Sequence, residues 1–345
     1  MKIRINMLSA AESVKGQGVA SAYREQVNLI KQIDSFDVSI NSKSSKFDIY
    51  HIHSPNLSYR LRMNKRHLNI MYVHFIPSKN HESIKLPKLF EKIFDWYVEN
   101  MYRKADELVV VNPCFSVDLE KMGISKNRIT YIPNFVNHEN FKALPLDKIS
   151  IIKDQYSIPK DKFVVLGCGQ IQTRKGIDDF VETAKQNPDM FFVWVGGFSF
   201  GRIMHGYKKY KKLMKNLPQN MINIPILDRE CMNGIFNACD VLFMPSYMEL
   251  FPMTLLEAAN VHKPFLVRDL ELYQPILFGK YAKGNNVNEF TNELRKLKDN
   301  LTYYSEQCAN AKFISEFYNE NMIKNMWKEY YLRVFQNWKS KNKRK

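Results

Sequence analysis

The sequence lacks a long apolar run. Nowhere in its 345 residues is there a stretch of the roughly 18 to 20 apolar residues that a membrane-spanning helix needs. Residues 1–18 pass from a short apolar segment directly into polar sequence, so no secretory signal peptide is predicted. We therefore expect a cytoplasmic protein without a spanning anchor.

Cysteines are few and scattered. The five of them show neither CxxC spacing nor histidines placed as in zinc sites, which argues against a disulfide framework and against a structural zinc ion. They are predicted to be reduced and mostly buried thiols, as in a cytosolic protein. These are Cys114, Cys168, Cys231, Cys239 and Cys308.

Acidic residues are too few to balance the basic ones. The 35 Asp and Glu residues against 51 Lys and Arg residues leave a formal net charge of +16, which predicts an anionic partner: nucleic acid, acidic lipid or a phosphorylated substrate. No zinc finger, RNP motif or basic zipper is present, so nucleic acid is not a predicted partner. A basic nucleic-acid-binding module is kept only as a minor alternative.

Short apolar runs alternate with amphipathic helical patterns along the chain. Strand-like runs at 2–8, 47–53, 69–75 and 107–112 are separated by helical stretches at 19–33 and 89–103. The same rhythm resumes at residue 163. Such alternation predicts two α/β domains, each a doubly wound parallel sheet of the Rossmann type, with ligands bound in the cleft between them. We predict domains over 1–150 and 151–320, and a C-terminal helix over 321–345 that crosses back to the first domain.

Two glutamates eight positions apart mark the start of a helix. Glu249 lies in a loop after the strand-like residues 241–246, whereas Glu257 lies inside the helix that follows. The backbone amides of Met253 and Thr254 then lie at the helix N-terminus, where they can bind a diphosphate. One carboxylate remains for a sugar and one for ribose hydroxyls. For an isolated pair, a surface loop and a solvated glutamate would be the better interpretation.

The surrounding sequence favours the first interpretation. Residues 239–259, CDVLFMPSYMELFPMTLLEAA, resemble the donor-binding segment of family 4 retaining glycosyltransferases, and residues 167–182, GCGQIQTRKGIDDFVE, resemble the segment that opens their C-terminal domain. The resemblance implies a GT-B fold and a nucleotide-sugar donor, with Lys175 and Arg174 facing the leaving diphosphate. Gln170 stands where the family has arginine, which leaves the role of Arg174 open.

The resemblance also implies how the reaction proceeds. The chain has no Asp-x-Asp motif, so no metal clamp is predicted and no cofactor is expected; Lys175 and helix-terminal amides would meet the leaving-group charge. No residue pair suggests a covalent nucleophile and an acid. We therefore expect front-face transfer with retention, with Glu249, Lys175 and His74 as the catalytic residues.

The N-terminal half supplies further candidates. Gly16 and Gly18 lie between the first strand and the first helix, where glycines allow close approach to a phosphate or sugar. His51, His53 and His74 each close a strand-like run. For His51 a structural role is favoured. The resemblance implies that His74 approaches the transferred sugar, with His53 a weaker candidate.

A narrower resemblance concerns residues 13–27, 72–87, 99–113 and 131–141. These are similar to the enzymes that add the second hexose in glycolipid assembly in low-GC Gram-positive bacteria and their wall-less relatives. It implies transfer of glucose or galactose from a UDP-hexose to monoglucosyl-diacylglycerol, giving an α-1,2-linked diglycosyl-diacylglycerol that anchors lipoteichoic acid. The alternatives are a synthase acting on diacylglycerol, a soluble enzyme of polysaccharide or protein glycosylation, and a non-catalytic scaffold. The presence of both glutamates argues against the scaffold.

Basic and aromatic segments predict contact with the inner face of the cell membrane. Residues 57–66 and 201–217 carry several cations and no acid, and the helix near 89–103 has an apolar stripe with Trp96 beside it. The alternative is a solvated basic face and an ordinary core stripe. The predicted membrane-binding residues are Trp96, Arg60, Arg62, Lys208, Lys209, Lys211, Lys212 and Lys215.

Overall fold

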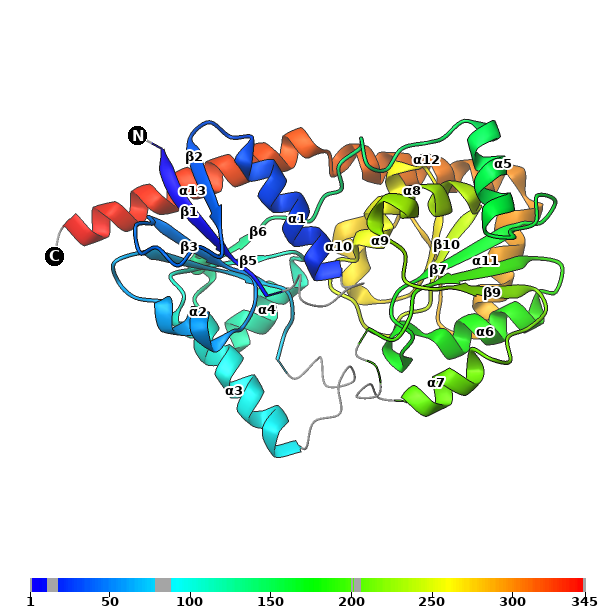
Figure 1. Ribbon diagram of the computed structural model, residues 1–345, viewed down its shortest axis with the longest axis horizontal. Helices are drawn as coiled ribbons and strands as arrows, with labels where there is room; N and C mark the ends of the chain where they lie inside the picture. The colour runs from blue at the N-terminus through cyan, green and yellow to red at the C-terminus, as the bar shows by residue number, and fades with distance from the viewer. Residues whose placement is uncertain (1, 11–17, 78–87, 200, 202–205, 344–345) are drawn as a thin grey trace.

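The computed structural model describes residues 2–10, 18–77, 88–199, 201 and 206–343 (Figure 1). Two six-stranded parallel sheets lie side by side, one built from the N-terminal half of the chain and one from the C-terminal half. The predicted pair of doubly wound α/β domains is therefore confirmed.

The first sheet has the strand order β2-β1-β3-β4-β5-β6. Its strands, buried on both faces except at the edges, read as the near-continuous apolar runs seen in the sequence. They are β1 (Ile3–Leu8), β2 (Phe36–Ile40), β3 (Ile49–Ile52), β4 (Leu68–Val73), β5 (Glu107–Val110) and β6 (Ile129–Tyr131). The helices are α1 (Gly18–Lys31), α2 (Leu57–Arg62), α3 (Lys88–Lys104) and α4 (Cys114–Lys121).

The second sheet has the order β12-β11-β10-β7-β8-β9. Its strands are β7 (Val164–Cys168), β8 (Phe191–Val195), β9 (Met221–Ile224), β10 (Val241–Met244), β11 (Phe265–Arg268) and β12 (Ala282–Gly284). Its helices are α5 (Leu146–Gln155), α6 (Ile177–Gln186), α7 (Tyr207–Leu213), α8 (Arg229–Ala238), α9 (Met253–Asn260), α10 (Gln274–Leu277) and α11 (Val287–Asp299), followed by α12 (Leu301–Phe317). The chain order reverses between β7 and β10, where ligands bind in open α/β sheets.

The last helix, α13 (Glu320–Lys343), lies along the first sheet although it follows the second in sequence (Figure 1). Its Trp327 and Tyr331 are buried, and the Tyr331 hydroxyl lies 2.5 Å from His51 Nδ1 in β3. His51 thus has the structural role that the sequence favoured. A domain limit at residue 150 would fall inside α5, so the exact domain limits stay a prediction.

Candidate active site

The loop after β7 approaches the loop after β10 very closely. Residues Thr173–Lys175 form a short 3-10 turn that ends at Gly176, which has a φ of 69°. A Cβ atom on Gly176 would lie 2.2 Å from the carbonyl oxygen of Pro245, so only glycine fits. The Tyr247 amide then donates to the Arg174 carbonyl at 2.8 Å. The two loops therefore meet where the strand order reverses.

Lys175 and Glu249 form an ion pair at this junction. Lys175 Nζ lies 2.5 Å from Glu249 Oε1, and Arg174 Nη1 lies 3.9 Å from Oε2; the Glu249 side chain is only 7% exposed. Burial would raise the pKa of Glu249, but the Lys175 and Arg174 cations outweigh it and hold this pKa below its usual range. Burial lowers the pKa of Lys175, and Glu249 opposes that shift. Three residues singled out in the sequence are thus brought together.

The first domain holds the loop that carries Glu249. Asn112, which follows β5, donates from Nδ2 to the Leu250 carbonyl at 3.1 Å, and Asn134 donates to the Phe251 carbonyl at 3.0 Å. Both asparagines are buried. Since Asn112 lies at the carboxyl end of a strand in the first sheet, this edge of the first sheet faces the second domain. Neither asparagine was predicted from the sequence, although a polar residue two positions after the buried strand β5 was a usable signal.

Glu257 is tied to both domains through an arginine. Arg229 Nη1 lies 3.0 Å from Glu257 Oε1, and Arg229 Nη2 lies 2.7 Å from Glu25 Oε1 in α1. Burial raises the pKa of Glu257 and of Glu25, and Arg229 opposes both shifts. Nothing in the local sequence marks Arg229 or Glu25, because their meeting depends on how the two domains pack.

Helix α9 begins beside this pair of charged clusters. Its N-cap is Pro252, which makes no side-chain capping bond, and Met253 is buried in the first turn. The Thr254 hydroxyl donates to the Met244 sulfur at 3.2 Å. The predicted anion-binding helix end therefore lies in the same region as Lys175, as the spacing of the two glutamates indicates.

Two histidines close strands of the first sheet at the same edge as Asn112. His53 Nδ1 lies 3.2 Å from His74 Nε2, so one ring donates a hydrogen bond to the other. Burial lowers the pKa of His74 to about 3 and that of His53 well below its usual value, so both rings are neutral at pH 7. His74 therefore acts as a neutral imidazole. No described contact joins it to Glu249 or Lys175.

Of the two glycines predicted to contact the donor, Gly16 and Gly18, only Gly18 lies among the described residues. Gly18 is the first residue of α1, and a Cβ there would meet nothing within 4 Å, so it borders open space. Gly16 lies outside the described residues. No group of three or more potential metal-ligating side chains occurs among the residues that the structure describes.

A mainly apolar cavity opens near the carboxyl ends of β8 and β9. Its volume is about 410 Å³, and it is lined in part by Ile171, Gly197, Phe198 and Ile226. The backbones at Gly196 and Gly169 lie very close together beside this cavity: a Cβ atom on Gly196 would lie 1.9 Å from the Gly169 carbonyl oxygen. The volume and the largely apolar lining fall in the range of small-molecule sites.

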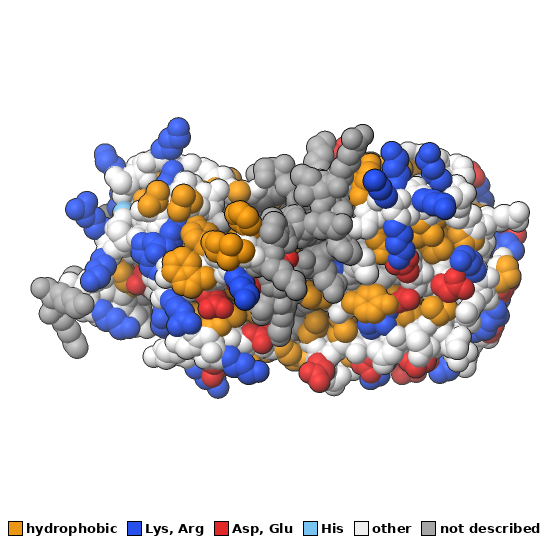
Figure 2. All heavy atoms as spheres, turned by 90° about the horizontal axis from the view of Figure 1, so that it is seen from below, with side chains coloured by type: hydrophobic (Ala, Val, Ile, Leu, Met, Phe, Trp, Pro, Cys, Tyr) orange, Lys and Arg blue, Asp and Glu red, His pale blue; other side chains and the backbone are white. Residues whose placement is uncertain are grey.

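A different surface lies on the outer side of the first domain. The apolar face of α3 and two leucines of α2 are exposed rather than packed on the sheet, whereas Val98 and Met101 of α3 are buried. The core-stripe alternative for these residues is therefore wrong. Figure 2 shows apolar side chains gathered with Lys and Arg on this part of the molecule. We call this the α2–α3 surface: Leu57, Leu61, Leu89, Phe90, Ile93, Phe94 and Trp96.

The predicted basic residues divide into exposed and bonded ones. Arg60 Nη2 donates to Asn100 in α3, Arg62 Nη1 donates to the Ser42 carbonyl, and Lys209 pairs with Asp178 at 2.8 Å. The remaining predicted lysines of the α7 region are exposed and form no ion pair with a described carboxylate: Lys208, Lys211, Lys212 and Lys215. No helix in the described part of the chain is both long and apolar enough to cross a membrane.

Comparison with known proteins decides the family. The family profile "Glycosyltransferase Family 4" matches residues 20–140, and "Glycosyl transferases group 1" matches residues 148–312. The chain is 38% identical over 334 residues to the alpha-galactosylglucosyldiacylglycerol synthase of Streptococcus pneumoniae, covering 96% of this chain and 89% of the relative. The chain belongs to glycosyltransferase family 4. It is therefore a glycosyltransferase, as predicted.

A further sequence relative and two solved structures are also similar to this family 4 glycosyltransferase. The processive diacylglycerol alpha-glucosyltransferase of Acholeplasma laidlawii is 24% identical over 298 residues, covering 86% of this chain and 88% of the relative. Among solved structures, sucrose-phosphate synthase from Thermosynechococcus elongatus superposes with a TM-score of 0.81 at 15% identity, covering 97% of this chain and all of that one. Anabaena HepE in complex with UDP-glucose gives 0.77 at 13% identity, with 96% and 100% covered. The predicted GT-B fold is confirmed.

Proposed function

We propose that this glycosyltransferase moves a hexose from a UDP-sugar to monoglucosyl-diacylglycerol at a membrane surface, forming an α-1,2-linked diglycosyl-diacylglycerol. The observation that carries the proposal is that one molecule has both a charged interdomain cluster at a sheet switch point and an exposed apolar, basic surface. The first suits a water-soluble anionic donor and the second suits a lipid acceptor. The names of the two relatives, both diacylglycerol glycosyltransferases, support the acceptor class.

The donor would lie across the carboxyl ends of the second sheet. The cavity near β8 and β9 takes the uracil ring, Glu257 accepts hydrogen bonds from ribose hydroxyls, and the diphosphate meets Lys175, Arg174 and the amides of Met253 and Thr254. HepE, whose solved complex contains UDP-glucose, has the same fold, which supports a donor of this kind.

The chemistry follows from the charges. The bond between the hexose C1 and the phosphate oxygen breaks, and negative charge develops on the diphosphate next to Lys175 and Arg174. The acceptor hydroxyl forms the new bond on the same face, and its proton passes to the departing phosphate oxygen. Glu249 holds Lys175 in place and hydrogen-bonds the hexose, and neutral His74 contacts the hexose from the first domain. In this proposal cationic side chains and helix amides carry the leaving-group charge, without a metal.

The acceptor side is proposed to use the α2–α3 surface. A peripheral protein reaches a lipid hydroxyl by inserting apolar side chains at the interface while cations meet acidic headgroups. The basic residues of the α7 region gather on the same face of the molecule as α3 (Figures 1 and 2). The enzyme would then work on the inner face of the cell membrane.

One assay tests the proposal. Purified protein is incubated with UDP-glucose or UDP-galactose, in parallel, and mixed micelles containing diacylglycerol, monoglucosyl-diacylglycerol or no lipid acceptor. We expect a diglycosyl-diacylglycerol from one donor and the monoglucosyl lipid. Product from diacylglycerol alone would instead assign the first glycosylation step. Transfer only to soluble saccharides would contradict the lipid acceptor.

A further inference from the structure

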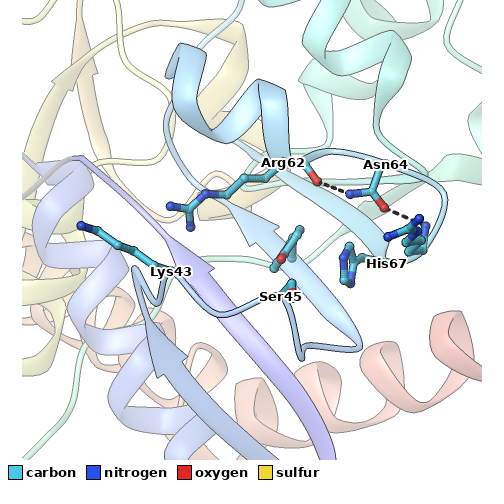
Figure 3. Close-up of a pocket in the computed structure, with 7 residues that line it drawn as sticks. Lys43, Ser45, Arg62, Asn64 and His67 are labelled. Atoms are coloured by element: carbon cyan, nitrogen blue, oxygen red, sulfur yellow. Dashed lines mark hydrogen bonds between the residues drawn. The ribbon is translucent and has the colours of Figure 1, made fainter.

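A second cavity lies on the first domain, far from the cleft edge of the sheet. Its volume is about 280 Å³, and it opens between the loop after β2 and the segment that links α2 to β4 (Figure 3). Tyr50 is the second residue of β3 and His67 precedes β4, so the cavity lies toward the amino ends of these strands. The active-site residues follow strand carboxyl ends. We call this cavity the α2 pocket: Lys43, Ser45, Tyr50, Arg62, Asn64, Arg66 and His67.

The α2 pocket carries cations without balancing acids. Lys43, Arg62 and Arg66 line it, and none of them forms an ion pair with a described carboxylate. The nearest acid in sequence, Asp48, is already bonded to Arg4 at 3.3 Å. Three positive charges around one small cavity create a local potential that favours an anion.

The walls of the α2 pocket are held by hydrogen bonds that do not depend on a ligand. Arg62 Nη1 donates to the Ser42 carbonyl at 2.8 Å, and Ser42 in turn exchanges two bonds with Asn6 of β1. Asn64 donates to the Arg62 carbonyl at 2.9 Å and accepts from the Arg66 amide at 2.9 Å (Figure 3). The first of these bonds orients the Arg62 guanidinium and the others hold the backbone of residues 62–66 before anything binds, which lowers the entropic cost of binding.

The floor of the α2 pocket is aromatic. The Tyr50 and His67 rings lie 4.4 Å apart between centroids, and both residues are buried. Burial raises the pKa of Tyr50, and the nearby Arg62 guanidinium acts against this rise. The Tyr50 hydroxyl therefore stays protonated at neutral pH.

The position of the α2 pocket relates it to the membrane-facing side. Side chains alternate along a strand, and His51 points to Tyr331 of α13, so the neighbouring Tyr50 points to the opposite face of the sheet, toward α2. Arg62 ends α2 directly after Leu61, whose side chain is among the most exposed apolar groups of the molecule at 75%. An anion in the pocket would thus lie beside apolar side chains of the α2–α3 surface.

We propose that the α2 pocket binds a phosphate ester, the group presented by the headgroup of an anionic phospholipid or by a soluble phosphate ester. Arginine guanidinium groups match phosphate oxygens with paired hydrogen bonds, and Ser45 adds a hydroxyl at the rim. The volume is just below the roughly 300 Å³ at which pockets for whole small molecules begin, so it suits a headgroup and not a nucleotide sugar. The site is separate from the transfer reaction; only the lipid source rests on the proposed function.

The test uses vesicles of matched surface charge. Co-sedimentation is measured on phosphatidylcholine vesicles that contain either phosphatidylglycerol, a phosphate ester, or oleate, a carboxylate. The variant is Lys43→Gln with Arg66→Gln, both exposed, which leaves the Arg62–Ser42 bond intact. The matched control is Lys31→Gln with Lys328→Gln, also exposed, on α1 and α13. A second arm titrates sn-glycerol 3-phosphate and inorganic phosphate without lipid, followed by NMR.

We expect the parent to bind phosphatidylglycerol vesicles about 10-fold more tightly than oleate vesicles, and the variant to lose this preference while the control keeps it. Loss of soluble phosphate binding in the variant would identify a soluble ester as the source. The proposal fails if the variant weakens binding equally on both vesicle types and soluble phosphate esters bind parent and variant alike. Sugar transfer in phosphate-free detergent micelles reports separately on the proposed function, and the variant should retain it.

Discussion

Charged residues usually lie at the surface and large apolar residues in the core, but the charged cluster between the domains and the α2–α3 surface show the opposite arrangement. In the cleft, Glu249 and Glu257 are buried and paired with cations, whereas on the α2–α3 surface large apolar groups such as Trp96, 67% exposed, face solvent. Buried charge is costly unless it is paired, and a contiguous exposed apolar patch is uncommon in a monomer. The pairing of the glutamates offsets the cost of burying them, whereas the exposed apolar side chains of the α2–α3 surface have no cover among the described residues. The cleft suits a charged donor, and the outer surface suits a lipid.

The largest effect is expected from Lys175→Ala, which removes a cation from the charged cluster between the domains. We expect turnover to fall at least about 100-fold, because a preorganised cation facing a leaving diphosphate is often worth that much. Stability should also drop, since the buried Glu249 loses its nearer cation and keeps only Arg174 at 3.9 Å, at a cost of up to about 3 to 5 kcal/mol. Steady-state kinetics and thermal unfolding measure the two effects.

The control for that variant is the double change Lys175→Ala with Glu249→Gln. It removes the buried carboxylate that has lost Lys175, so stability should return toward that of the parent while activity stays low. If activity returned together with stability, Lys175 would be structural and not catalytic.

The outer side is tested by Phe90→Ser with Trp96→Ser, both exposed on α3. Burying such side chains at a bilayer should contribute about 2 kcal/mol together, so vesicle binding is expected to weaken about 30-fold, with little dependence on salt. Exposed apolar groups elsewhere, Val117 and Leu146, give the matched control as the pair Val117→Ser with Leu146→Ser. Equal loss in both variants would remove the α2–α3 surface from the membrane contact.

Charge on the same face is tested at the α7 region. The lysines to change to Gln are the four that form no ion pair with a described carboxylate, whereas Lys209 is kept because it bonds Asp178. Cations near an acidic bilayer contribute up to about 1 kcal/mol each and are screened by salt, so we expect about a 10-fold loss at physiological salt and a larger one at low salt. The variant combines changes at Lys208, Lys211, Lys212 and Lys215; a control changes four other exposed lysines that form no ion pair with a described carboxylate, Lys121, Lys126, Lys148 and Lys162. An identical loss in both would indicate a net-charge effect.

Glu257→Gln separates the roles of the two cleft glutamates. We expect UDP affinity to fall about 10-fold in calorimetry, because a charged hydrogen-bond acceptor for ribose is lost. Glu25→Gln is the matched control, since it removes the other partner of Arg229 without removing a donor contact. Glu249→Gln should leave UDP affinity unchanged and reduce transfer. If Glu25→Gln and Glu257→Gln weakened UDP binding equally, Glu257 would act only through Arg229.

The smallest effect concerns a carboxylate outside the cleft that has no ion pair among the described residues. Burial raises the pKa of Glu107 to about 7, with Arg333 opposing the rise. The folded state then holds this proton more tightly than the unfolded state, so stability should fall as pH rises from about 4.3 to 7. Glu107→Gln should raise the free energy of unfolding, and with it the melting temperature, at pH 8 but not at pH 4; the gain should be about 1 kcal/mol or less because the side chain is partly exposed. Glu306→Gln, at an exposed position, should change neither.

The sequence by itself determined the order of the elements and predicted which residues form a donor site. Alternating apolar and amphipathic runs predicted two parallel sheets, because that periodicity follows from the local backbone geometry of strands and helices. The resemblance of residues 239–259 and 167–182 to family 4 segments predicted that Glu249, Glu257 and Lys175 share one site, whereas the pairing of β7 with β10 that brings Lys175 to Glu249 was seen only in the structure.

Only the tertiary structure decided which partners those residues have. Arg229 of the second domain meets Glu25 of the first because the two domains pack together, and no local pattern encodes a contact across more than 200 positions of the chain. In the same way, the apolar stripe of α3 reads like a core stripe in the sequence. Whether such a stripe is covered depends on what packs against it, and here the described part of the fold leaves Phe90 and Trp96 in solvent.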